Sequence, residues 1–127
     1  MNKVIGTITV QENQILSGNH HIVVNVPIAN GQSNIKAGML LYRDEGDYKA
    51  LSASSLATED PVAIALEDMK GNADNTILTA VIHGAVLAEK LMYGDEGAIT
   101  ESAVLALNGS GIYALGSVDA DPVENSN

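Results

Sequence analysis

Three carboxylates crowded around one glycine are the residues best placed, by type and spacing, to do chemistry. Asp44, Glu45 and Asp47 surround Gly46 between two apolar runs in the stretch LLYRDEGDYKAL. A calcium loop needs oxygen ligands at alternate positions and a more distant glutamate, because Ca²⁺ takes roughly six to eight oxygens. This cluster has neither that spacing nor the distant glutamate. A glycine with a polar neighbour between strand-forming runs is typical of a hairpin tip, so the sequence predicts a turn here and no metal site.

The adjacent histidines His20 and His21 are a second candidate for metal binding. Neighbouring residues of a strand point to opposite faces, so both imidazoles could bind one ion only within a loop. No third ligand stands at a recognisable spacing, and we expect both to be surface residues. The stretch Gly109-Ser110-Gly111 also lacks the Lys-Ser/Thr pair of a phosphate-binding loop. We therefore predict no metal and no cofactor.

His83, within the strand-like run VIHGAV, is the one candidate for a catalytic base. A general base of this kind needs a serine or threonine within hydrogen-bond reach and a carboxylate that orients it. Serines are present within residues 52–55, but the chain has no G-x-S-x-G turn to present one. A histidine packed against the backbone or a neighbouring subunit is the favoured interpretation. We predict no catalytic residue and a protein that is not an enzyme.

The charge of the chain excludes several kinds of partner. It has 127 residues, 16 of them acidic and 6 basic, and a net charge of −10. Binding to nucleic acid or to an anionic membrane depends on clustered Lys and Arg, which this sequence lacks. It also lacks Cys and any apolar run long enough to cross a membrane. We expect a soluble protein without a secretory signal peptide, without nucleic acid and without a membrane partner.

Alternating β-branched residues predict strands in the first part of the chain. In Lys3–Val10, the residues Val4, Gly6, Ile8 and Val10 share one side, and Ile5, Thr7 and Thr9 share the other. A turn is expected at Ser17–Asn19, a second strand over His21–Ile28, and a loop over Asn30–Asn34. Pro27 near the end of the second strand indicates an edge or a strand terminus.

The rest of the chain predicts more short strands and little helix. Gly84 breaks the longest strand, which indicates a bulge or a close backbone approach. Thr100 is the expected N-cap of a helix that ends at Asn108-Gly109. The predicted fold class is mainly β with one or two short helices. Because Phe and Trp are absent, the core is completed either by thin aliphatic layers or by a neighbouring subunit. The strands are expected at Met39–Tyr42, Tyr48–Leu51, Pro61–Glu67, Thr76–Leu87 and Ile112–Leu115, with one helical turn or an irregular connection at 52–60.

The order of four segments resembles that of a known family. They are Ala37–Leu41 (AGMLL), Gly46–Leu51 (GDYKAL), Pro61–Leu66 (PVAIAL) and Thr79–Val86 (TAVIHGAV). In this order they resemble the lambda-type head decoration proteins of tailed bacteriophages, in which a strand leads into a hairpin, a short strand follows, and a long strand carries a small residue before a helix. The resemblance covers residues 35–115.

The resemblance implies a small β-tulip-like domain that assembles as a homotrimer. Such trimers bind the outer surface of the expanded head at three-fold and quasi-three-fold points and bridge neighbouring major capsid proteins. The protein would thus be made in the host cytoplasm and belong to the virion. The domain expected on this basis spans residues 17–116, followed by an acidic, mobile tail at 117–127. An N-terminal arm, 1–16, would add a strand to the capsid through Val4, Ile5, Thr7, Ile8, Thr9 and Val10.

Two other kinds of protein stay open at this point. The first is a carbohydrate-binding or adhesive β-module, although the shortage of aromatic residues counts against a sugar-stacking platform. Its only aromatic candidates are Tyr42, Tyr48, Tyr93 and Tyr113. The second is a small hydrolase that uses His83 with a nearby serine.

Overall fold

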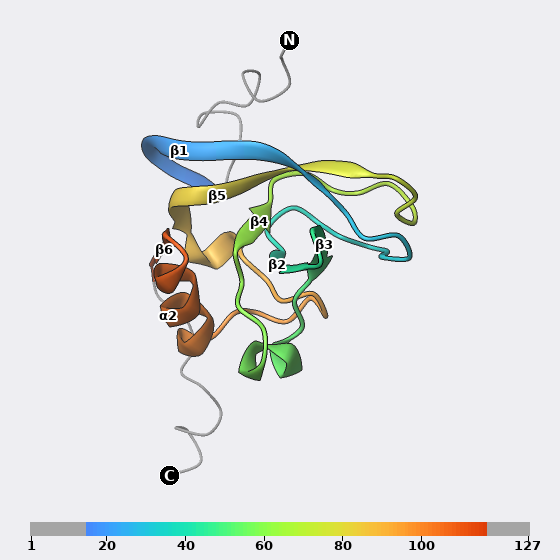
Figure 1. The fold of residues 1–127 in the computed structure, drawn as a ribbon. Coiled ribbons are helices and arrows are strands. Elements are labelled where there is room, and N and C mark those ends of the chain that lie inside the picture. Colours follow the sequence, from blue (N-terminus) through green and yellow to red (C-terminus); the bar gives the residue numbers. More distant parts are fainter. Residues whose placement is uncertain (1–14, 117–127) are drawn as a thin grey trace.

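The computed structural model describes residues 15–116, in which one six-stranded sheet carries the fold (Figure 1). Two short 3₁₀ helices and one α-helix complete this part of the chain. The prediction of a mainly β domain with little helix is therefore confirmed. The elements are β1 (Leu16–Pro27), β2 (Leu40–Asp44), β3 (Asp47–Ala50), η1 (Ala53–Ala57), β4 (Ala63–Ala65), β5 (Ile77–Leu87), η2 (Ala88–Lys90), α2 (Glu101–Gly109) and β6 (Ile112–Leu115).

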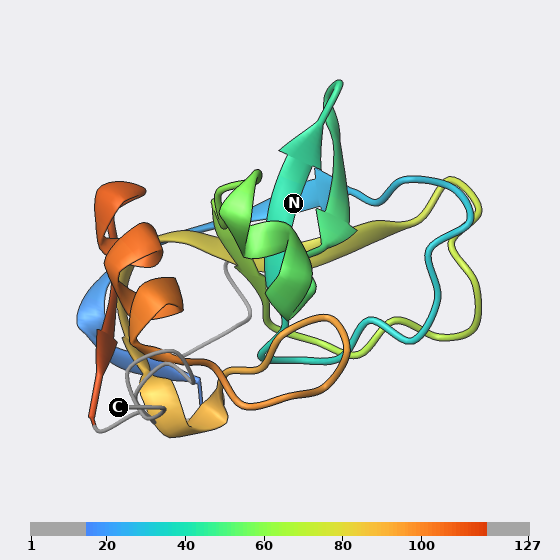
Figure 2. The ribbon, with the colours of Figure 1, turned by 90° about the horizontal axis from the view of Figure 1, so that it is seen from below.

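Strand β5 lies inside the sheet because it pairs along both of its edges. The strand order is β1-β5-β4-β2-β3, and β6 pairs with β5 off this path. β1 runs antiparallel along one edge, from Leu16 opposite Val86 to Pro27 opposite Ile77. Two strands share the other edge of β5. β4 pairs with the middle of β5, and β6 pairs in parallel with residues 84–87 of β5. β6 consequently lies at the margin of the sheet, as Figures 1 and 2 show.

The two ends of the main strand path come together just beyond β1. Ile28 forms a parallel bridge with Tyr48 of β3, and the Ala29 N–H donates to the Tyr48 carbonyl at 3.0 Å. The sheet is thereby curled until its first and last strands touch. A curled sheet encloses one face and leaves the other to be covered by helices and loops.

Both faces of the sheet are buried, which is how a chain without Phe or Trp fills its interior. Successive strand residues point to opposite faces, so Leu40 and Leu41 enter different apolar clusters, as do Ile64 and Ala65. α2 and the segment after η2 cover the first face with Leu91, Tyr93, Ile99, Ala103 and Leu107. The enclosed face is filled mainly by small or flexible side chains, among them Met39, Ala63, Met69, Ala73 and Ala80.

The acidic cluster is the tip of a hairpin, as predicted. Glu45 and Gly46 connect β2 to β3 with φ values of 54° and 96°. Two successive positive φ values match the right-handed twist of the strands on either side. The predicted buried strand is also confirmed, because every residue of β4 is fully buried.

The helix begins after Thr100, but this threonine does not cap it as expected. Its backbone is extended (φ −119°, ψ 177°), and its side chain makes no hydrogen bond to the first turn. The Thr100 hydroxyl instead pairs with the Tyr93 hydroxyl at 2.8 Å. Tyr93 is buried, and a buried phenol needs a hydrogen-bond partner. The Thr100 side chain therefore satisfies the Tyr93 hydroxyl instead of capping the helix.

The expected turn at Ser17–Asn19 is wrong, because β1 starts at Leu16 and runs through these residues. The polar residues instead form a large bulge within the strand. Ser17 lies opposite Ala85, whereas Ile22, the next paired residue, lies opposite His83. Leu16, which the sequence assigned to the arm, is a buried member of the sheet.

Candidate interaction surface

The predicted capsid-binding residues Val4, Ile5, Thr7, Ile8, Thr9 and Val10 lie outside the described residues, as does the acidic tail. The structure does locate the point from which both segments leave. The Ile15 carbonyl accepts a hydrogen bond from the Leu87 N–H at 2.8 Å. Leu115, near the other end of the described chain, is the strand partner of the same Leu87. Ile15 and Leu115, near the two ends of the described chain, therefore both lie beside the last residue of β5.

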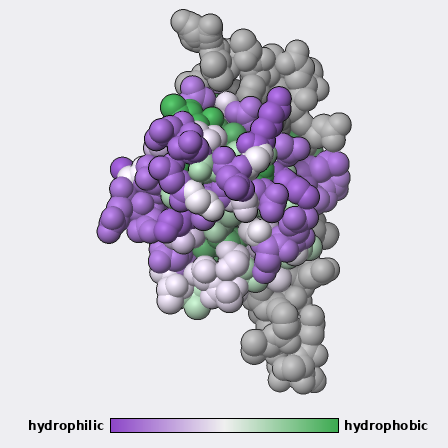
Figure 3. Space-filling model, turned by 90° about the vertical axis from the view of Figure 1, so that its right-hand side faces the viewer, coloured by the Kyte–Doolittle hydropathy of each residue, from purple (hydrophilic) through white to green (hydrophobic). Residues whose placement is uncertain are grey.

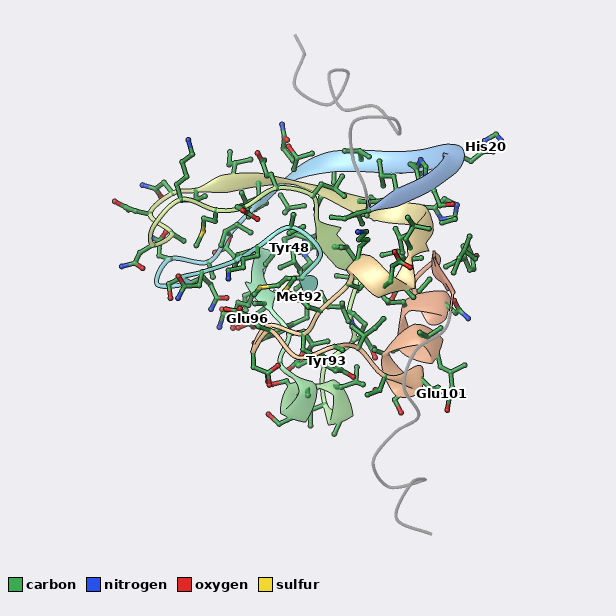
Figure 4. All side chains as sticks on the ribbon, turned by 180° about the vertical axis from the view of Figure 1, so that it is seen from behind. His20, Tyr48, Met92, Tyr93, Glu96 and Glu101 are labelled. Carbon is green, nitrogen blue, oxygen red and sulfur yellow. The ribbon has the colours of Figure 1, made fainter. Side chains whose placement is uncertain are left out.

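A bulge held by His21 shapes β1 close to this point. The His21 Nε2 lies 2.7 Å from the Ser17 carbonyl oxygen and 3.0 Å from the Ala85 carbonyl oxygen. Both partners are acceptors, so Nε2 carries the proton and donates it. The side chain thus ties the start of the bulge to β5. His20, the neighbour of His21, is exposed and extends away from the end of the sheet in Figure 4.

Gly84 permits the bulge to approach β5. Its φ is +123°, and a Cβ at this position would lie 2.6 Å from the His20 carbonyl oxygen. That distance is too short for any side-chain carbon, so only glycine fits. The interpretation of Gly84 as a bulge or close backbone approach is confirmed.

His83 is packed against β6 and the turn that precedes it. Its ring meets the Tyr113 ring edge to face, with centroids 6.2 Å apart and planes at 82°. An added Cβ on Gly111 would lie 2.9 Å from the His83 Nδ1. The serines of residues 52–55 hydrogen-bond among themselves in and just before η1, which lies at the bottom of Figure 1, away from β5. The structure does not bring His83 and these serines together.

One exposed face of the sheet carries apolar side chains and no charge. Ile22 lies opposite His83 in the β1–β5 pair, and residues directly opposite share a face. The same rule places Ala85 with Tyr113 and Leu87 with Leu115. The side chains exposed here include Ile22 at 51%, Tyr113 at 46% and Leu115 at 48%. Ser17 belongs to it as well, because it lies opposite Ala85. We call this surface the β6 face and define it by Ser17, Ile22, His83, Ala85, Leu87, Tyr113 and Leu115.

The far end of the molecule has the opposite character. The connections over residues 28–38 and 67–76 extend to the right in Figure 1, and Figure 3 shows that side covered largely by hydrophilic side chains. Paler side chains gather toward its bottom, where η1 is found, and smaller white and green areas lie between the hydrophilic ones. An exposed ion pair, Lys36 Nζ to Glu96 Oε1 at 3.1 Å, belongs to the polar surface. The polar surface of these connections thus contrasts with the apolar β6 face.

The acidic hairpin binds its own lysine. Lys49 Nζ lies 2.8 Å from Asp44 Oδ2, across the β2–β3 pair. The hydrogen bond to Asp44, with its negative charge, raises the pKa of Lys49 above the ordinary value of 10.5. Within residues 15–116, no group of three or more His, Asp or Glu side chains could hold a metal ion. The same residues contain no helix long and apolar enough to cross a membrane.

No known family model and no curated protein matches this chain.

The β6 face was not predicted from the sequence, although a signal for it was present. All residues of Ile112–Leu115 are apolar or aromatic (IYAL), although this strand lies at a sheet margin. In a strand that covers a core with one face, apolar residues normally alternate with polar residues that point to solvent. The missing alternation is the sign that β6 carries apolar side chains on its exposed face as well as on its buried face.

Proposed function

We propose that this chain is a structural virion protein. In this proposal it is a trimeric decoration protein that binds the outer surface of the expanded head of a tailed bacteriophage. It occupies three-fold and quasi-three-fold sites, where it stabilises the head by bridging neighbouring major capsid proteins. It performs no reaction and needs no cofactor.

The observation that carries this proposal is the order of the four segments AGMLL, GDYKAL, PVAIAL and TAVIHGAV. They contribute to β2, β3, β4 and β5, which are adjacent in one sheet in the order β5-β4-β2-β3. The resemblance therefore concerns a connected part of the fold and not scattered loops. The mainly β architecture supports the proposal in the same way.

The arm proposed to bind the capsid is the N-terminal segment up to Gln14. Its alternation over Val4–Val10 suits main-chain pairing with an exposed sheet edge of a capsid subunit. Ile15 is buried and β1 begins at the buried Leu16, so we place the end of the arm before these two residues. The net charge of −10 is consistent with an outer surface that does not hold DNA.

Co-sedimentation with expanded, undecorated heads tests the function directly. Purified protein is titrated onto heads of the phage that encodes it, and the copies bound per head are counted. Saturable binding in multiples of three per site is the expected result. Heads that leave the protein in the supernatant at every concentration would overturn the proposal.

The arm is tested by three variants in the same assay. Deletion of residues 1–14 and the Thr7→Pro substitution should both abolish binding, since proline cannot donate to a strand ladder. Thr7→Ala keeps the backbone donor and should bind as the parent does. Full binding by the truncated protein would show that the arm assignment is wrong while leaving the decoration function intact.

A carbohydrate-binding module is the second candidate, and one observation favours it. Tyr113 is the tyrosine exposed on the uncharged β6 face, where a sugar ring could stack. A glycan array probed with the parent and with Tyr113→Ala decides this. Binding that is lost in the variant supports the module, and an array without any parent signal removes it.

A further inference from the structure

We propose that the β6 face is the surface through which copies of this chain contact one another. The structure exposes five large apolar side chains among the described residues, and three of them, Ile22, Tyr113 and Leu115, lie on this face. The other two, Ile77 and Leu105, stand at separate places, one at the start of β5 and one on α2. Contiguous exposed apolar surface is a mark of a protein–protein contact, whereas single exposed residues are not.

The edge of β6 is open beside this face. Its only strand partner within residues 15–116 is β5, and Figures 1 and 2 show no described element beyond it. An open strand edge offers unpaired backbone groups to a second chain. The apolar face and the open edge thus meet along one short strand, with Tyr113 and Leu115 belonging to both.

Charge identifies a second copy as the occupant. Each copy carries a net charge of −10, so two copies repel wherever their carboxylates approach. The β6 face contains no Asp, Glu, Lys or Arg, and its polar groups include the imidazole of His83 and the hydroxyl of Ser17, which lies opposite Ala85. Two copies of such a face can therefore meet without charge repulsion. In a symmetric assembly, residues close to the rotation axis contact the same residues of the neighbouring copy.

This assignment has a consequence for the arms. Leu87, whose N–H binds the Ile15 carbonyl, belongs to the β6 face, so association would bring the roots of all arms to one place. When one arm of an assembly has bound a capsid strand, the other arms are held close to neighbouring capsid strands. Their effective concentration at those strands is therefore raised. The number of copies, three, and this use of the arms rest on the proposed function. The choice of the face does not.

A charge placed on the face tests the contact. Leu115→Glu and Tyr113→Glu put a carboxylate where copies meet, and both positions are exposed enough to accept it in the folded monomer. Sedimentation equilibrium of the full chain should show a trimer for the parent and a loss of at least about tenfold in association for each variant. Leu105→Glu is the matched control, since Leu105 is exposed at 70% on α2 and should leave the parent mass unchanged.

Cysteine cross-linking keeps the test independent of any effect of glutamate on folding. The chain has no cysteine, so Leu115→Cys introduces a single thiol. Under mild oxidation it should form disulfide-linked dimers, each disulfide forming as two thiols lose their protons and two electrons to the oxidant. Ile77→Cys, exposed at the opposite end of β5, should stay uncross-linked under the same conditions.

The outcomes separate this inference from the proposed function. A parent that is monomeric at all concentrations yet binds heads overturns the inference alone. A parent that forms trimers but does not bind heads contradicts the proposed function alone. The inference is still supported in that case if Leu115→Glu and Tyr113→Glu dissociate the trimer and Leu105→Glu does not. If Leu115→Glu keeps the trimer but loses head binding, the face belongs to the capsid contact and the assignment to a second copy is wrong. Equal cross-linking of Leu115→Cys and Ile77→Cys also contradicts it.

Discussion

The carbonyl oxygen of His20 lies where a side chain on Gly84 would have to be. A Cβ built on Gly84 would stand 2.6 Å from this oxygen and 2.7 Å from the His21 ring. The bulge of β1 and the break in β5 are therefore two sides of one contact. This contact shapes the end of the sheet from which the terminal segments leave and on which the β6 face lies.

Gly84→Ala is expected to destabilise the fold by about 2–5 kcal/mol, since it combines a positive φ with a backbone collision. Urea denaturation measures the change in the free energy of unfolding. Gly109→Ala is the control, because a Cβ there meets nothing within 4 Å and its φ is ordinary. A Gly84→Ala protein as stable as the control would show that β1 does not approach β5 in this way.

His21→Ala should cost about 1–2 kcal/mol, because it removes the donor that ties Ser17 to Ala85. His20→Ala, which removes an exposed neighbour, should change stability by less than about 0.5 kcal/mol. Thermal unfolding of both variants gives the comparison. Equal losses would mean that the imidazole of His21 does not hold the bulge.

Leu107→Ala and Leu105→Ala form a matched pair on α2. Leu107 is fully buried in the cluster that α2 covers, so its truncation should cost about 2–5 kcal/mol. Leu105 is exposed, and the same truncation should cost less than about 0.5 kcal/mol. Denaturant unfolding distinguishes the two. If the order of the two losses were reversed, α2 would present its other face to the sheet.

Asp44→Asn should lower the pKa of Lys49 toward 10.5, since the carboxylate that raises it is gone. A raised pKa in the folded state favours the charged amine. The contribution of the pair is therefore complete below the unfolded pKa and is lost as pH rises through the folded value. Because the pair is exposed, we expect no measurable change in stability at neutral pH. NMR titration of the Lys49 side chain in both proteins measures the shift.

Local sequence patterns correctly predicted the elements that depend only on residues close together in the sequence. The hairpin at Glu45-Gly46 follows from a glycine between strand-forming runs, and β4 follows from an apolar run after Pro61. Gly84 was identified because a glycine within a strand needs a reason. In each case the residues that carry the signal are the residues that adopt the structure.

Long-range pairing decides the features that the sequence did not reveal. Ser17–Asn19 has the composition of a turn, but β1 pairs with β5 on both sides of Gly18 and Asn19, so these residues form a bulge within a strand. The contact of Ile28 with Tyr48 and the parallel pairing of β6 leave no periodic mark in the sequence. The extent of the β6 face beyond Ile112–Leu115 likewise depends on register between three strands. The capsid-binding role of Val4–Val10 stays a prediction.

The central place of β5 has a consequence for how the chain folds during synthesis. β1 leaves the ribosome early, but its partner follows only after β2, β3 and β4 have been made. The β2–β3 hairpin can close on its own within microseconds, whereas β1 must wait for a contact between distant parts of the chain. A chain that stops before Ile77 leaves β1 without its strand partner, and such a strand is prone to pair with other chains. Premature termination should thus produce aggregates rather than a smaller folded domain.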